Sequence, residues 1–230
     1  MKPPPHPPAS PDDVLAALGP LLTEERKARI EEVLAARLGG LTVVLENLHD
    51  PHNGAAALRS VEGFGLSELH VVESNEPFRF AHSVPIGCDK WVALTKYKTF
   101  AACAEVLHAR GMKLYAAVPG AQMTLSDIDP VTPAALVFGN EHDGLSELAQ
   151  SACDATFSIP MTGFTQSFNL SVSVALGVFE HSRRRRAALG RPGDLPDEER
   201  ARLRAEWYAL SMDRRAAAGL VARYVSEKTR

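Results

Sequence analysis

Short strand-like runs alternate with helical segments along most of this chain, and this alternation limits the possible fold more than any other feature. The predicted strands are rich in apolar and β-branched residues and lie at 41–45, 68–72, 113–118, 134–138 and 155–160. Helical patterns lie between or after them, at 55–63, 100–110, 145–150 and 169–186. Such alternation is typical of a mostly parallel sheet with helices on both faces. The sequence therefore predicts an α/β fold.

Helices also flank the predicted sheet. Thr23 can cap a helix that ends near Gly39, and residues 197–226 contain two more helical segments rich in Ala and Arg. The Pro-rich start is typical of a disordered segment. We therefore expect a disordered lead at 1–20, one domain at 21–190 that includes the N-terminal helix, and a C-terminal helical extension at 191–230.

Composition excludes several classes of protein. No apolar run approaches the roughly 20 residues that cross a bilayer, and Met1–Ser10 lacks the apolar core of a secretory signal. The 3 cysteines are odd in number and far apart, which favours a reducing cytoplasm. Neither the cysteines nor the 8 histidines show metal-ligand spacing. We expect a cytoplasmic protein without a membrane segment or a metal site.

Positive charge is concentrated at the C-terminal end although the whole chain carries a net charge of −3. From residue 181 onward there are 13 Lys+Arg against 7 Asp+Glu, and Arg183–Arg186 form the centre of this excess. Phosphate binding depends on local cation density rather than on net charge. The four arginines are equally typical of a solvated helix end, where cations suit the helix dipole. Both interpretations remain open.

Three turn segments, 46–59, 139–144 and 159–173, each follow a predicted strand. Carboxyl ends of parallel strands lie at one edge of the sheet, so we expect these segments to meet there and form a ligand site. Asn53 begins a helix, Arg59 offers a planar fork suited to phosphate, and Glu141 can orient an amino-bearing ligand. Ser167 and Asn169 are good helix caps. Each segment alone is also typical of an ordinary surface turn. No dinucleotide-binding or P-loop motif is present.

Together the three segments resemble the motifs of SPOUT-class RNA 2′-O-ribose methyltransferases of the TrmH type. The similar residues are 45–53 with Arg59, 136–141 with Gly144, and 159–161 with 166–172, and the resemblance spans roughly 22–190. It implies a mostly parallel sheet with a C-terminal deep trefoil knot, flanked by N- and C-terminal helices. It also implies a homodimer that acts on tRNA.

The resemblance further implies an activity and the residues that perform it. We expect S-adenosylmethionine-dependent 2′-O-methylation of a tRNA ribose, at guanosine 18 of the D-loop. The expected catalytic residues are Arg59, Asn53, Glu141, Ser167 and Asn169. S-adenosylmethionine would contact backbone groups near Ala117, Gly139, Ile159 and Phe168, and tRNA would contact Arg29, Arg37, Arg183 and Arg185.

Three alternatives are weighed against this expectation. The first is the same chemistry on ribosomal RNA, although residues 1–22 are too short for the separate substrate domain that ribosomal RNA relatives often carry. The second is an RNA-binding protein without activity, which gives no reason for the intact polar residues. The third is an unrelated α/β enzyme for small molecules, which gives no reason for the arginine cluster.

Overall fold

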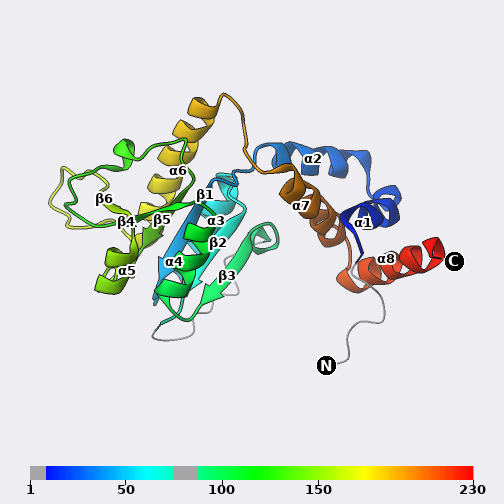
Figure 1. Cartoon of the computed structure of the whole chain (residues 1–230), viewed down its shortest axis with the longest axis horizontal. Coiled ribbons are helices and arrows are strands. Elements are labelled where there is room, and N and C mark those ends of the chain that lie inside the picture. The colour runs from blue at the N-terminus through cyan, green and yellow to red at the C-terminus, as the bar shows by residue number, and fades with distance from the viewer. Residues whose placement is uncertain (1–8, 75–86, 230) are drawn as a thin grey trace. The chain divides into compact units, whose positions relative to one another are not determined.

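A computed structural model describes residues 9–74 and 87–229 of the chain. The chain forms two compact units (Figure 1). The first is the sheet unit, Arg37–Asp194, and the second is the terminal unit, which combines Met1–Ala36 with Leu195–Arg230.

The sheet unit contains six strands that all run parallel, in the order β3-β2-β1-β5-β4-β6. The strands are β1 (Leu41–Glu46), β2 (Glu68–Val72), β3 (Ala93–Tyr97), β4 (Lys113–Ala117), β5 (Ala134–Phe138) and β6 (Ala155–Phe157). The predicted α/β class with a parallel sheet is confirmed. Strand β3 was not predicted, because four of its five residues are exposed and its sequence shows no apolar alternation.

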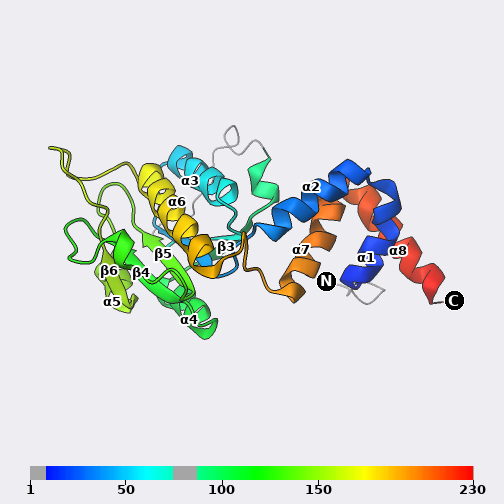
Figure 2. The ribbon, with the colours of Figure 1, turned by 90° about the horizontal axis from the view of Figure 1, so that it is seen from above.

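Helices cover both faces of the sheet (Figure 2). On one face lie α3 (Pro51–Gly63) and α6 (Leu170–Leu189), and on the other lie α4 (Phe100–Ala109) and α5 (Glu147–Ala152). Alternate residues of a strand point to opposite faces, so Val43 and Leu45 pack with α3 and α6 while Val44 packs with α4. Both faces of the sheet are buried under helices, which explains the continuous apolar runs in the sequence.

Helix α6 approaches β5 closely at Gly177. A methyl group at this position would lie 3.1 Å from Cζ of Phe138 and 3.3 Å from Cδ1 of Leu136. The missing side chain therefore lets α6 lie directly on the central strands. This packing fixes the first turn of α6 near the carboxyl edge of the sheet.

The terminal unit consists of α1 (Pro11–Leu18), α2 (Glu24–Ala35), α7 (Asp197–Leu210) and α8 (Arg214–Lys228). Arg204 of α7 grips Glu31 of α2 through two bonds of 2.5 and 2.7 Å. Helix α1 lies within the lead that we expected to be disordered. It forms there because Ser10 and Asp13 make a capping box at its start, where Pro11 is the first helical residue. Residues 1–8 of that lead lie outside the described residues. Helix α2 packs with α7 of the same unit. Across the described chain, every helix is too short or too polar to cross a bilayer.

One buried histidine of the sheet unit has no hydrogen-bond partner among the residues that the structure describes. The side chain of His181, on α6, is 0% exposed, and neither ring nitrogen is bonded. Burial, followed by the positive charges of Arg185 and Arg184, lowers the pKa of His181 to about 4, while Asp129 and Glu180 oppose the shift. The fold therefore accepts this imidazole in its neutral form.

This histidine makes the protein sensitive to mild acid. Between pH 6.5 and about 4 the unfolded chain binds a proton at His181 that the folded chain does not bind. The free energy of unfolding should therefore fall with falling pH, by up to about 1.4 kcal/mol per pH unit. Urea denaturation at several pH values should show this slope in the wild type and a flatter one in His181→Leu. Equal slopes would assign the acid sensitivity to other groups.

Candidate functional site

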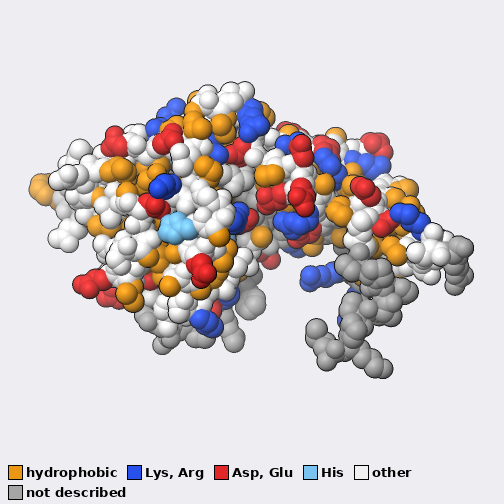
Figure 3. All heavy atoms as spheres, viewed as in Figure 1, with side chains coloured by type: hydrophobic (Ala, Val, Ile, Leu, Met, Phe, Trp, Pro, Cys, Tyr) orange, Lys and Arg blue, Asp and Glu red, His pale blue; other side chains and the backbone are white. Residues whose placement is uncertain are grey.

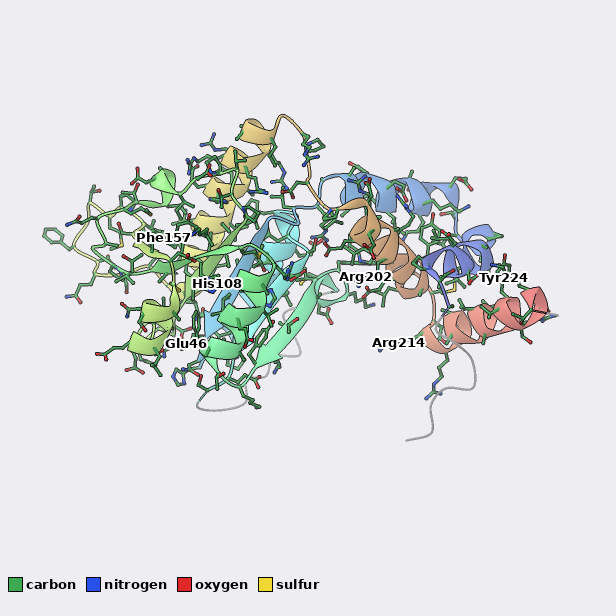
Figure 4. The ribbon with its side chains drawn as sticks, viewed as in Figure 1. Glu46, His108, Phe157, Arg202, Arg214 and Tyr224 are labelled. Carbon is green, nitrogen blue, oxygen red and sulfur yellow. The ribbon has the colours of Figure 1, made fainter. Side chains whose placement is uncertain are left out.

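A cavity of about 610 Å³ lies at the carboxyl edge of the sheet, between the ends of β4, β5 and β6 and the start of α6. Its volume is typical of small-molecule sites. Its floor is apolar, because Phe138 and Phe157 pack edge to face with their ring centroids 6.1 Å apart (Phe157 is labelled in Figure 4). The segments 139–144 and 158–169 form its polar walls.

The wall after β5 is a tight hairpin. Asn140 and Gly144 exchange two backbone hydrogen bonds of 3.2 Å, and the side-chain oxygen of Asn140 accepts from the N–H groups of His142 and Asp143. A Cβ at Gly139 would lie 2.0 Å from the carbonyl carbon of Gly144, so only glycine fits there. This bonding holds the intervening Glu141 in a defined position.

Three of the predicted catalytic residues are joined by hydrogen bonds. Asn53, in the first turn of α3, donates to Oε1 of Glu141 at 2.5 Å. Asn169, the N-cap of α6, donates to Oδ1 of Asn53 at 3.0 Å. Glu141, Asn169 and Ser167 line the cavity, and Asn53 contacts it through its two partners. The structure thus brings residues of all three turn segments together.

The predicted cofactor residues also lie together. Ala117, Gly139, Ile159 and Phe168 come from the ends of three strands and the start of a helix, and all four line the cavity. Arg59 is different, because it is not among the residues that line the cavity. It is exposed on α3, where its charge opposes the burial that raises the pKa of the Cys88 thiol.

Two of the four predicted RNA contacts are exposed. The side chain of Arg29 is 64% exposed and pairs with Glu32, and that of Arg183 is 59% exposed and pairs with Glu180. These exposed i,i+3 pairs are weak, so both guanidinium groups are available to a phosphate.

The other two predicted contacts are corrected by the structure. Arg37 is 0% exposed and donates to the carbonyl oxygen of Leu66 at 2.6 Å and to the carboxylate of Glu62 at 2.9 Å. Arg185 is 4% exposed and grips Asp194 through Nε, at 2.7 Å, and Nη2. Both guanidinium groups are held inside the fold and present no surface to RNA.

Three of the four side chains in the run Arg183–Arg186 point inward, because backbone carbonyl oxygens of the fold accept hydrogen bonds from them. Arg184 donates to the carbonyl oxygens of Leu125 and Ile128, and Arg185 donates to three carbonyl oxygens within 130–132. Arg186 donates to carbonyl oxygens of Phe64 and Pro192. Three of the four side chains therefore fasten loops to α6.

Two histidines near the cavity were not among the predicted site residues. His142 lines the cavity, and the centroid of its ring lies 5.8 Å from that of His49, in the loop before α3. Asn140, whose side chain shapes the hairpin, was not among them either. An Asn between a buried strand and a Gly-bounded turn is a signal for such backbone capping and could have been used.

Comparisons with known proteins find relatives of this chain. The SpoU rRNA Methylase family matches residues 40–179. A tRNA (guanosine(18)-2′-O)-methyltransferase of Thermus thermophilus is 37% identical over 80% of this chain and 96% of its own length. The enzyme of that name from Borreliella burgdorferi is also 37% identical, over 73% of this chain and 79% of its own. A crystal structure of a TrmH/SpoU tRNA modifying enzyme from A. aeolicus superposes with a TM-score of 0.72, at 26% identity over 83% of this chain and 98% of that one.

The inward arginines should matter for stability and the outward one should not. Arg185→Met leaves the buried carboxylate of Asp194 without its counter-ion, still bonded to the backbone N–H groups of Gly39 and Gly40, and should lower the free energy of unfolding by about 3–5 kcal/mol. Arg183→Met removes only an exposed pair and should cost less than about 1 kcal/mol. Urea denaturation of both variants measures the difference, and equal losses would contradict the structural role of Arg185.

Proposed function

The chain belongs to the SpoU rRNA Methylase family, and on that basis we propose that it methylates the 2′-hydroxyl of guanosine 18 in tRNA. The methyl donor is S-adenosylmethionine. The relatives that bear this activity in their names match over most of the chain and most of their own length. Only RNA carries a 2′-hydroxyl, which defines the substrate class.

One observation carries this proposal: the segments that follow β4, β5 and β6 form a single cavity with an apolar floor and a carboxylate in its wall. These features fit S-adenosylmethionine, whose adenine is aromatic and whose sulfonium and ammonium groups are positive. Gly139, Ala117 and Ile159 would bring backbone groups close to the ligand, and Phe168 would offer a ring for the adenine. The negative charge of Glu141 would favour the positive sulfonium through space, without a hydrogen bond to the donor.

When bound, S-adenosylmethionine would supply an electrophilic methyl group, and displacement by the 2′-oxygen would break its S–C bond, release a neutral thioether and need no metal ion. The chain must orient the ribose and help its hydroxyl lose a proton. A guanidinium group keeps its proton at neutral pH and is a poor base. We therefore assign Arg59 to holding the phosphate and ribose and to stabilising the charge that develops on oxygen. Arg59 stands on α3 outside the cavity, so it would hold the RNA beside the mouth.

An apolar surface supports a homodimer. Val172, Leu176 and Phe179 lie on one face of α6 and are 43%, 38% and 49% exposed. With Phe64 and the small residues of α3 they line a groove of about 430 Å³. Residues 155–179 contain no charged side chain, and Phe164 is fully exposed in the loop between β6 and α6, where Figure 3 shows hydrophobic atoms at the tip. A second copy would cover this surface.

Further properties belong to the same proposal. The C-terminal part of this unit would be threaded into a trefoil knot, as its membership of the family implies. Exposed Arg29 and Arg183 would contact tRNA phosphates. The protein would work in the cytoplasm, where tRNA is modified.

Arg59 and the target nucleotide can be tested together. The wild type, incubated with labelled S-adenosylmethionine and tRNA, should methylate the ribose of guanosine 18, mapped by nuclease digestion and mass spectrometry. Arg59→Lys keeps the charge but loses the planar fork, so kcat/KM should fall at least about 100-fold. Arg214→Lys, on α8 (Figure 4), is the control and should keep full activity. Methylation of ribosomal RNA alone would favour the alternative substrate, and full activity of Arg59→Lys would refute the bidentate role.

The oligomeric state is tested on the apolar face of α6. Leu176→Arg places a charge in the proposed interface and should convert a dimer into a monomer in sedimentation experiments. Leu148→Arg is the matched control, because Leu148 is 79% exposed on α5, away from α6. A wild-type monomer, or dissociation by both variants alike, would contradict the interface.

A further inference from the structure

The bonds between Asn169, Asn53 and Glu141 have a direction. The side-chain oxygen of Asn169 accepts from the N–H and the hydroxyl group of Ser171, at 2.9 and 2.7 Å, so its amide nitrogen is turned toward Asn53. That nitrogen donates to the oxygen of Asn53, whose own nitrogen is thereby turned toward Glu141. The first turn of α6 therefore sets the orientation of two amides and, through them, of one carboxylate.

The chain of bonds ends on a carboxylate that is only half satisfied. Oε1 of Glu141 accepts from Asn53, whereas Oε2 is buried and has no hydrogen-bond partner in the described part of the chain. Burying an unbonded carboxylate oxygen is unfavourable, and folds retain such a group where it has a use. Glu141 as a whole is only partly buried, and it lines the cavity.

We propose that Asn53 and Asn169 are positioning residues that act through Glu141. They hold its carboxylate so that it accepts a hydrogen bond from an O–H or N–H group of the target nucleoside. This inference rests on the proposed function and adds to it a division of labour. Glu141 touches the substrate, whereas the two asparagines orient Glu141.

The position of Asn53 favours RNA over the methyl donor as the source of the hydrogen bond. Asn53 does not line the cavity that fits the donor. It reaches Glu141 from α3, the helix that also carries the exposed Arg59. The carboxylate thus stands between the donor cavity and the helix that would hold the RNA.

Exchanging the two groups separates positioning from simple structural bonding. Asn53→Asp alone places two carboxylates together and should lower both the melting temperature and kcat. Asn53→Asp combined with Glu141→Gln restores an amide–carboxylate bond in the opposite direction, so the melting temperature should recover. Because the carboxylate now stands at position 53, kcat should stay at least about 10-fold below the wild type. Recovery of kcat together with stability would overturn the proposal, since the bond alone would then be sufficient.

A second comparison tests whether Asn53 works through Glu141. Glu141→Gln removes a buried charge, so it should keep or raise the melting temperature while lowering kcat. Adding Asn53→Ala to Glu141→Gln should lower kcat little further, because the group that Asn53 orients is already absent. If Asn53→Ala lowered kcat as much in the Glu141→Gln variant as in the wild type, Asn53 would act independently of Glu141. This result would contradict its role as a positioning residue.

Binding measurements identify the ligand and keep the result separate from the proposed function. Glu141→Gln should weaken the binding of unmethylated tRNA but not of S-adenosylhomocysteine, each titrated alone. The reverse pattern would assign the hydrogen bond to the methyl donor and overturn the choice of RNA. If the wild type methylated no tRNA at all, the proposed function would fail. The melting temperatures of the exchange variants would still report on the hydrogen bond between positions 53 and 141.

Discussion

The parallel direction of all six strands is the constraint on which the rest of the structure depends. It places the carboxyl ends of β1, β4, β5 and β6 at one edge, where the chain must turn into a loop after each strand. Residues as far apart in sequence as Asn53, Glu141 and Asn169 become neighbours only for this reason. The packed cores on both faces of the sheet hold the strands in place, so the loops extend from a well-packed scaffold.

Much of the sheet could be predicted because its central strands are buried on both sides. β2 and β5 have the predicted bounds. β5 is an uninterrupted apolar run, whereas in β2 the apolar residues alternate with Glu68 and His70 before Val71 and Val72. β3 could not be predicted, because an exposed edge strand carries polar residues that resemble a loop. Helix α1 was hidden by the proline at its start, which suits a first helical turn as well as a disordered lead.

The candidate site could also be predicted only in part from the sequence. Residue types after each strand were enough to predict which side chains meet, because strand direction alone places them. The sequence could not reveal burial, which depends on partners far away in the fold. Arg37 and Arg185 read as surface cations, yet Glu62 and Asp194 neutralise them inside the protein. The direction of the hydrogen bonds from Asn169 to Asn53 and on to Glu141 could not be predicted either, because it depends on the detailed packing of these side chains.

The inward arginines of α6 change how this protein meets a polyanion. A run of four cations in the printed sequence suggests a strong attractive field, but three of the four guanidinium groups face carbonyl oxygens of the same subunit. Asp194 cancels the charge of Arg185, and fewer guanidinium groups can touch a phosphate backbone than the sequence suggests. Discrimination among nucleic acids would then depend more on the fit of a folded shape than on the number of arginine–phosphate contacts.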